Sequence, residues 1–249
     1  MLAQRAALRR LVTAGLLLSF CLMTAGNDAA AEAPAPWQGL IEAGKVEFEF
    51  YDPERNPQRY PGQTTYFFHV AQQYRFQYEI DRQGAKASLA IRPTMRQVTC
   101  RVEHKMLLPK RLDTDHRWND PLLRHEFDHV AVSTDPRVPL LAEHLLRKIC
   151  KLTVEIDPRQ AVDNQYVDRI VQEEIGRRRE AVIELIRANY QRLDDVTRHG
   201  TRPIADRESF FKSFYTQAEL RKSGFRYLAE ATDLLGSRAY AKTPLSYVH

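Results

Sequence analysis

The sequence lacks a dense run of basic residues, and this argues against nucleic acid as a partner. After residue 31 it has no apolar run long enough to span a membrane, so we expect no stable membrane insertion. No internal repeat occurs, and the one biased stretch is a short Ala/Pro-rich segment near the N-terminus. With 249 residues, 43% of them hydrophobic, the chain can form one sizeable core or a domain with an appendage.

Residues 1–31 have the three parts of a secretory signal peptide. A basic start is followed by an apolar run from Leu11 to Met23, and Ala29 to Ala31 supplies a cleavage site, with Thr24 to Gly26 as an alternative. Phe20 precedes Cys21, where lipoprotein processing requires a small side chain, so the segment does not predict a lipoprotein. We therefore expect a periplasmic or secreted protein.

The predicted signal peptide carries three Arg and one Asp, so its removal lowers the formal charge of the chain from +5 to +3. Two of these residues, Arg9 and Arg10, also raise a twin-arginine export route, which the following residues fit poorly. The Lys and Arg residues that remain are typical of an ordinary solvated surface.

The stretch most informative about function is residues 121–130, which contains the motif H-E-x-x-H at His125, Glu126 and His129. On a helix the two His lie one turn apart on the same face, so both imidazoles can bind one Zn²⁺. The carboxylate of Glu126 can then reach a water molecule and act as a general base in hydrolysis. Asn119 or Asp120 can cap this helix, with Pro121 at its first position.

Two cysteines, Cys100 and Cys150, remain after the signal peptide is removed. Because an exported protein matures in an oxidising compartment, we expect them to form a disulfide. The bridge would close a loop of about fifty residues around the H-E-x-x-H helix, which the chain-entropy model values at roughly 4 kcal/mol.

The pattern of apolar residues predicts an antiparallel sheet followed by helices, an α+β fold. The expected strands are residues 45–51, 64–80, 87–92 and 97–108, joined by a loop at 52–63 and a turn at 81–85. The expected helices are residues 121–132, 140–152, 162–190 and 206–240, the last with a break at Gly224; residues 193–203 are expected to form a loop. Residues 32–38 are expected to be a flexible start of the mature chain.

Catalytic zinc usually has three protein ligands, so a third ligand is needed beside the two His. Asp135 has the spacing of the third ligand in H-E-x-x-H-x-x-G-x-x-H/D enzymes, although Val132 replaces the Gly. Glu143 or His144 could come from the next helix. His199 precedes Gly200, where the backbone can turn sharply. Chemistry alone does not rank these candidates.

Several short motifs resemble those of an exported bacterial family of unknown function, described as zinc-dependent proteases of the zincin type. They are Cys100-Arg-Val102, Leu123-Arg-His-Glu-x-x-His129, Cys150, and Tyr190 followed by Thr197-x-His199-Gly200. The resemblance covers residues 45–200. It implies a zincin-like fold, His199 as the third zinc ligand, and Tyr190 as a donor that stabilises the oxyanion.

Two departures from the family pattern stand out. Asp128 occupies the position before the second His, where the family usually has Gly, and could add a charged contact near the metal. Asp135-Pro136 and Pro139 interrupt the region in which the family's first helix continues. The chain after Gly200 has no counterpart in the resemblance.

These observations predict a signal peptide (1–31), a leader (32–44), a zincin-like metallopeptidase domain (45–204) and a helical C-terminal appendage (205–249). The expected function is zinc-dependent hydrolysis of a peptide or protein substrate in the cell envelope. The alternative is an envelope binding or assembly protein on the same scaffold, with a structural metal or none. A zinc amidase acting on cell-wall peptides would share the site.

Overall fold

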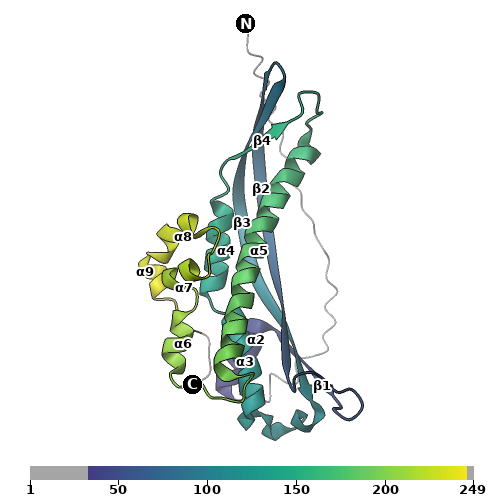
Figure 1. Ribbon diagram of the computed structural model, residues 1–249, viewed down its shortest axis with the longest axis vertical. Helices are drawn as coiled ribbons and strands as arrows, with labels where there is room; N and C mark the ends of the chain where they lie inside the picture. The colour runs from purple at the N-terminus through teal and green to yellow at the C-terminus, as the bar shows by residue number, and fades with distance from the viewer. Residues whose placement is uncertain (1–32, 246–249) are drawn as a thin grey trace.

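A long, bent β-hairpin is the largest feature of the computed structural model, which describes residues 33–245 (Figure 1). Strand β2 (Gln63–Gln83) pairs antiparallel with β3 (Lys86–Pro109), and the register shifts once, between Gln73 and Tyr74. The alternation of β-branched and aromatic residues with polar ones explains the extended conformation. The two strands expected over residues 87–108 are thus one continuous strand.

Two short strands complete the sheet on the other edge of β3. The N-terminal β1 (Val46–Tyr51) runs parallel to the last part of β3, and β4 (Leu152–Ile156) runs antiparallel to its first part. The expectation of an antiparallel sheet is therefore corrected to a mixed one. The loop of residues 52–62 is long enough to cross the end of β3, which places β1 and β2 on opposite sides of it.

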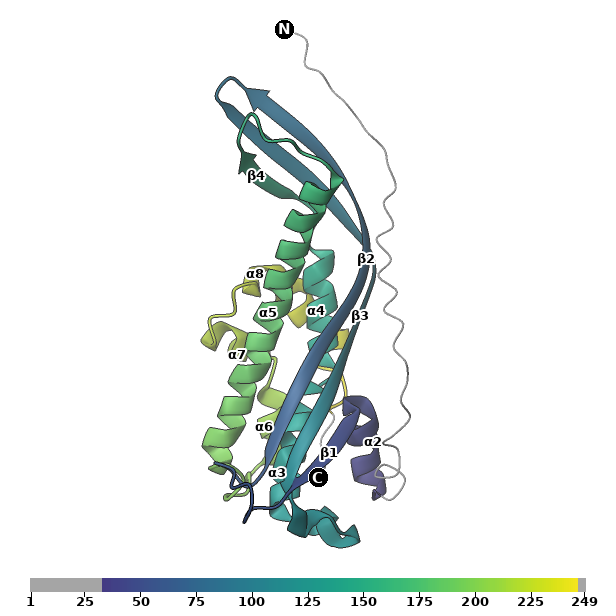
Figure 2. The same ribbon diagram turned by 90° about the vertical axis from the view of Figure 1, so that its right-hand side faces the viewer.

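Three helices lie along one face of the hairpin (Figure 2). They are α3 (Pro121–Ser133), α4 (Arg137–Arg147) and α5 (Asn164–Thr197). Their apolar positions recur at helical spacing and are buried against the alternate residues of β2 and β3 that face them. Helix α5 runs from the turn end of the hairpin to the end that carries α3, which brings its last turns beside the H-E-x-x-H motif.

The expected leader is instead partly a helix, α2 (Ala35–Gly44). Its side chains Trp37, Leu40 and Ile41 are buried, and the Trp37 ring lies 4.8 Å from that of Phe127 on α3. The apolar spacing of these three residues drives the helix onto the core. The predicted signal peptide, residues 1–31, lies outside the described residues.

The segment that we expected to be an appendage shares the core of the site-bearing helices. It forms α6 (Arg207–Ser213), α7 (Gln217–Lys222), α8 (Leu228–Leu235) and α9 (Arg238–Ala241) in place of the one interrupted helix expected. Phe211, Phe214 and Tyr215 are buried in the same apolar cluster as Phe127 and Leu185. Two short 3₁₀ helices, Lys110–Leu112 and Asp115–Asn119, connect β3 to α3.

The expected disulfide is absent from the structure, in which Cys100 and Cys150 are both free. Leu152 pairs with Ile91, nine residues before Cys100 on β3, a separation of about 30 Å along an extended strand. Cys150 is only two residues from Leu152, and two residues of extended chain span about 7 Å of this separation of about 30 Å. The Cα atoms of a disulfide must approach within about 7 Å, so the strand register rules out the bridge.

Within residues 33–245, none of the helices has the length and apolar character needed to cross a membrane.

Candidate metal centre

Helix α3 begins as its sequence predicts and presents both histidines to the same side. The side chain of Asp120 accepts a hydrogen bond from the Leu122 amide at 2.8 Å, and Pro121 stands at the first position. The rings of His125 and His129 lie 4.8 Å apart, and both side chains are buried. The expected helix, its cap and the pairing of the two His are thus confirmed.

The third member of the cluster is Asp194, near the end of α5. Its Oδ1 lies 3.1 Å from Nε2 of His125 and 3.1 Å from Nε2 of His129. Among the described residues, these three form the one group of potential metal ligands whose donor atoms all lie within 4.8 Å of one another. Two imidazole nitrogens and one carboxylate oxygen form a donor set typical of catalytic zinc.

The spacing of the donor atoms also suits a zinc ion. Zinc bonds to N and O donors are about 2.0–2.1 Å long, and tetrahedral geometry then separates two donors by about 3.3 Å. The two 3.1 Å separations between the Asp194 oxygen and the imidazole nitrogens are close to that value. The residues present therefore fit a tetrahedral metal with a remaining open position.

Asp194 and His125 shift each other's pKa values in the directions that favour their charged forms. Burial alone would raise the pKa of Asp194, but its hydrogen bonds with His125 and His129 hold the pKa of this carboxyl well below its usual range. Burial alone would lower the pKa of His125, whereas the contact with Asp194 and the charge of Glu126 raise it. The carboxylate is therefore ionised at neutral pH, as a metal ligand must be.

The structure does not bring His199 into this cluster. Its side chain is 47% exposed, its ring stacks on that of Tyr60 at 4.6 Å, and its Nδ1 lies 3.6 Å from Oδ1 of Asp194. Arg198 and His199 both adopt positive φ directly after α5 ends, and the imidazole is not among the donors that lie within 4.8 Å of one another. The geometry does not favour the expectation of His199 as third ligand: among the described residues, Asp194 is the third member of the group of potential ligands.

The other three candidates are engaged elsewhere. Asp135 is buried in an ion pair with Arg137, with a shortest separation of 2.5 Å. Glu143 pairs with Arg147 on the exposed side of α4. His144 Nε2 contacts the backbone carbonyl of Glu230 at 2.9 Å.

Glu126 is buried directly beside the start of β2. The Thr64 hydroxyl donates to its Oε2 at 2.8 Å. A Cβ atom at Gly62 would lie 2.5 Å from Oε1, so only Gly leaves room for this carboxylate. Burial raises the pKa of Glu126, and the adjacent His129 and His125 oppose that shift. A carboxylate with a raised pKa is suited to exchanging protons near neutral pH.

The ring of Tyr190 packs against the ring of His129. The two rings lie 4.5 Å apart, and the Tyr190 hydroxyl is 3.0 Å from Oγ of Ser133. Ser133 Oγ in turn lies 2.6 Å from Nε2 of His104, whose Nδ1 is 2.7 Å from the Gly44 carbonyl. Since that carbonyl only accepts, His104 donates through Nδ1 and accepts at Nε2 from Ser133, so Tyr190 donates to Ser133.

This chain of hydrogen bonds occupies the Tyr190 hydroxyl in the structure, so the expected oxyanion role stays a prediction. Burial raises the pKa of Tyr190 well above its ordinary value and keeps the phenol protonated. Nδ1 of His129 is buried without a hydrogen-bond partner among the described residues. Packing against Tyr190 and the contact of Nε2 with Asp194 therefore set the orientation of this ring.

The turn that follows α5 packs closely against His125. Gly200 has φ +78, and a Cβ there would lie 2.8 Å from Cγ of His125. On the other side, the loop before β2 lines a cavity of about 200 Å³ that includes Arg59, Tyr60 and Gly62. Gly62 also packs closely against Glu126, so one lining residue of this cavity neighbours the motif carboxylate.

Asp194 was missed because the long helix was expected to end near Tyr190, with a loop from residue 193. The apolar spacing in fact continues to Leu193, seven residues after Ile186, and both are fully buried. That signal extends the helix and places Asp194 four residues after Tyr190, on the same face.

Comparisons with protein-family models, with curated proteins and with solved structures found no match to the chain. The structure has an α+β fold with a mixed sheet, and the zincin-like fold stays a prediction.

Proposed function

We propose that the protein is a zincin-type, exported zinc peptidase, with His125, His129 and Asp194 as the metal ligands. The observation that carries the proposal is the position of one carboxylate oxygen 3.1 Å from both imidazole nitrogens of an H-E-x-x-H helix. Bound zinc would lower the pKa of a water ligand and polarise a carbonyl group.

Glu126 supplies the proton transfers in this mechanism. As a carboxylate it accepts the proton of the attacking water, and it then donates that proton to the departing amine. The Thr64 hydroxyl orients the carboxylate through its hydrogen bond, and the absence of a side chain at Gly62 leaves room for it. The raised pKa favours the first of these transfers, because a protonated Glu126 is less costly than an ionised one in a buried site.

The position of the site beside a sheet edge supports a peptide as the substrate. Strand β2 is an edge strand, and Thr64 near its start contacts Glu126. An extended peptide can pair with the free backbone groups of such an edge. The cavity beside Gly62 could receive a side chain of that peptide.

The test is the substitution Glu126→Gln. We expect the variant to bind one zinc per chain with the affinity of the wild type and to lose hydrolysis of a broad peptide library. The exposed Glu143→Gln serves as the control and should retain full activity. Peptide hydrolysis by Glu126→Gln at the wild-type rate would exclude the mechanism. A wild type that binds zinc at one equivalent and cleaves no peptide would favour the binding or assembly alternative.

A further inference from the structure

Asp128, which directly precedes His129 in the motif, forms an ion pair with the C-terminal segment, here residues 207–241. Asp128 is 4% exposed and accepts two hydrogen bonds from Arg207, at 2.5 and 2.8 Å. Arg207 is the first residue of α6 and comes 79 positions later in the chain. A fork of two parallel hydrogen bonds fixes the direction of the carboxylate as well as its distance.

The same segment holds the end of α3. The Tyr215 hydroxyl donates to the Val132 carbonyl at 2.7 Å, and Tyr215 is fully buried. Arg137, which follows α3, donates to the carbonyls of Phe211 and Lys212 at 2.9 and 3.0 Å. Residues 207–215 therefore contact α3 beside the ligands and at its C-terminal end.

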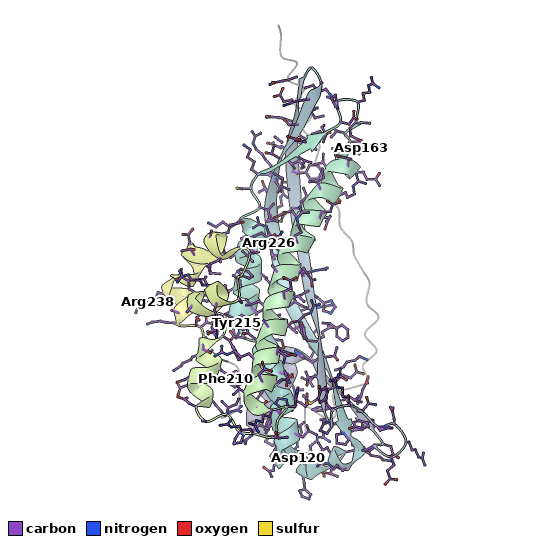
Figure 3. The ribbon with its side chains drawn as sticks, in the orientation of Figure 1. Asp120, Asp163, Phe210, Tyr215, Arg226 and Arg238 are labelled. Carbon is purple, nitrogen blue, oxygen red and sulfur yellow. The ribbon has the colours of Figure 1, made fainter. Side chains whose placement is uncertain are left out.

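The segment also contacts the other helix that supplies a ligand. Arg192, two residues before Asp194 on α5, lies over the rings of Phe210 and Phe214 at 5.1 and 5.2 Å. It also pairs with Glu219 at 3.2 Å. Figure 3 shows Phe210 and Tyr215 on the C-terminal segment where it lies against the long helix.

The metal centre needs α3 and α5 in a fixed relative position, because two of its ligands come from one helix and one from the other. Partners of the residues around a metal typically orient its ligands and change metal affinity 10–100-fold when they are removed. The C-terminal segment touches both helices within a few residues of the ligands.

We infer that Arg207 is a positioning residue for the metal centre, which it serves by fixing Asp128 and with it the face of α3 that carries His125 and His129. This inference rests on the proposed zinc site. It makes the C-terminal segment part of the metal-binding unit and gives a role to Asp128, the motif residue that departs from the family pattern.

The experiment compares Arg207→Gln, Arg207→Lys and Asp128→Asn with the wild-type full chain. Zinc affinity is measured by calorimetric titration, and the visible absorption of the Co²⁺-loaded protein reports the coordination geometry. We expect Arg207→Gln and Asp128→Asn to weaken zinc binding by about 10–100-fold and to alter the Co²⁺ spectrum. Arg207→Lys should bind zinc more tightly than Arg207→Gln but less tightly than the wild type, because Lys keeps the positive charge and cannot form both parallel hydrogen bonds to Asp128.

Arg147→Gln is the matched control, since it removes one Arg charge from an exposed pair on α4 and should leave zinc affinity unchanged. The double variant Asp128→Asn with Arg207→Gln should lose no more affinity than the weaker-binding single variant, because one interaction is removed in both. Tyr215→Phe, which removes the hydroxyl's bonds to Val132 and Asn189, should give a smaller loss. Arg207→Lys provides the test if Arg207→Gln does not fold.

The inference would be overturned if every folded Arg207 and Asp128 variant kept wild-type zinc affinity and an unchanged Co²⁺ spectrum and showed only a lower unfolding temperature. The proposed zinc site would not be affected by that result. A wild-type protein that binds no zinc would overturn both the proposed function and this inference.

Discussion

Oδ1 of Asp194 lies 3.1 Å from Nε2 of His129, although 65 residues separate the two along the chain. The contact joins the end of the longest helix to the H-E-x-x-H motif and replaces the expected contact from His199. It also leads to the first of four predictions about the site and the fold.

Asp194→Asn should lower zinc affinity more than about 100-fold, beyond the range observed for groups that only surround a metal. His199→Ala should lower it much less, because the imidazole is half exposed and stacked on Tyr60. Asp195→Asn, at the next position and bonded to Gln191 on the exposed side, is the control. Calorimetric titration with zinc measures all three. A larger loss for His199→Ala than for Asp194→Asn would reverse the assignment.

Gly62→Ala should impair catalysis without affecting metal binding. The added Cβ would lie 2.5 Å from Oε1 of Glu126 and 2.9 Å from Leu122, so the carboxylate must move. A displacement of about 1 Å at a catalytic group can cost about 100-fold in rate. We expect a fall in kcat of that order with unchanged zinc affinity. Gly39→Ala has nothing within 4 Å of its new Cβ and should behave as wild type; an equal effect of the two substitutions would contradict the prediction.

The stability of the zinc-free protein should fall on acidification because of His104. Burial lowers its pKa to about 4 in the folded protein, against about 6.5 in an unfolded chain. Between these values the unfolded chain binds more protons, so stability is fully present above pH 6.5 and is lost as pH falls towards 4. The loss attributable to His104 is about 3 kcal/mol.

The raised pKa of His125 acts in the opposite direction: its contribution is present at low pH and is lost as pH rises through its folded value. The measurement is therefore a difference, namely guanidinium unfolding of the wild type and His104→Gln in chelator at pH 7 and pH 4. His104→Gln should show the smaller change with pH. The exposed His116→Gln should keep the wild-type change, and identical changes in all three proteins would contradict the prediction.

Both cysteines of a chain that begins at residue 32 should be found as free thiols. Cys150 is exposed and should react with a thiol reagent in the native protein. Burial raises the pKa of Cys100 to about 11, so it should react only slowly until the protein is unfolded. Cys150→Ser should cost far less than the 2–5 kcal/mol typical of a lost disulfide. A protein that gains mass on reduction and shows no free thiol would disprove this.

The sequence predicts the structure correctly where interactions between neighbouring residues decide the local conformation. The cap at Asp120, Pro121 at the first position, and the placement of His125 and His129 on one face follow from helix geometry alone. The positions of β2 and α5 likewise follow from the alternation and helical spacing of apolar residues, although their exact ends did not.

Three features required the tertiary structure. The direction of β1 depended on a loop that crosses the end of β3, and the fate of Cys100 and Cys150 depended on the register of β4. The position of Asp194, rather than His199, beside His125 and His129 depended on how far α5 continues and on which side it passes α3.

The sequence by itself thus determined the two imidazoles, the adjacent carboxylate and the helix that presents them, because residues three and four positions apart on a helix share one face. Only the tertiary structure decided which distant carboxylate lies beside the two imidazoles and that Arg207 meets Asp128. Contacts across tens of residues depend on how whole elements pack, and no local spacing in the chain encodes that packing.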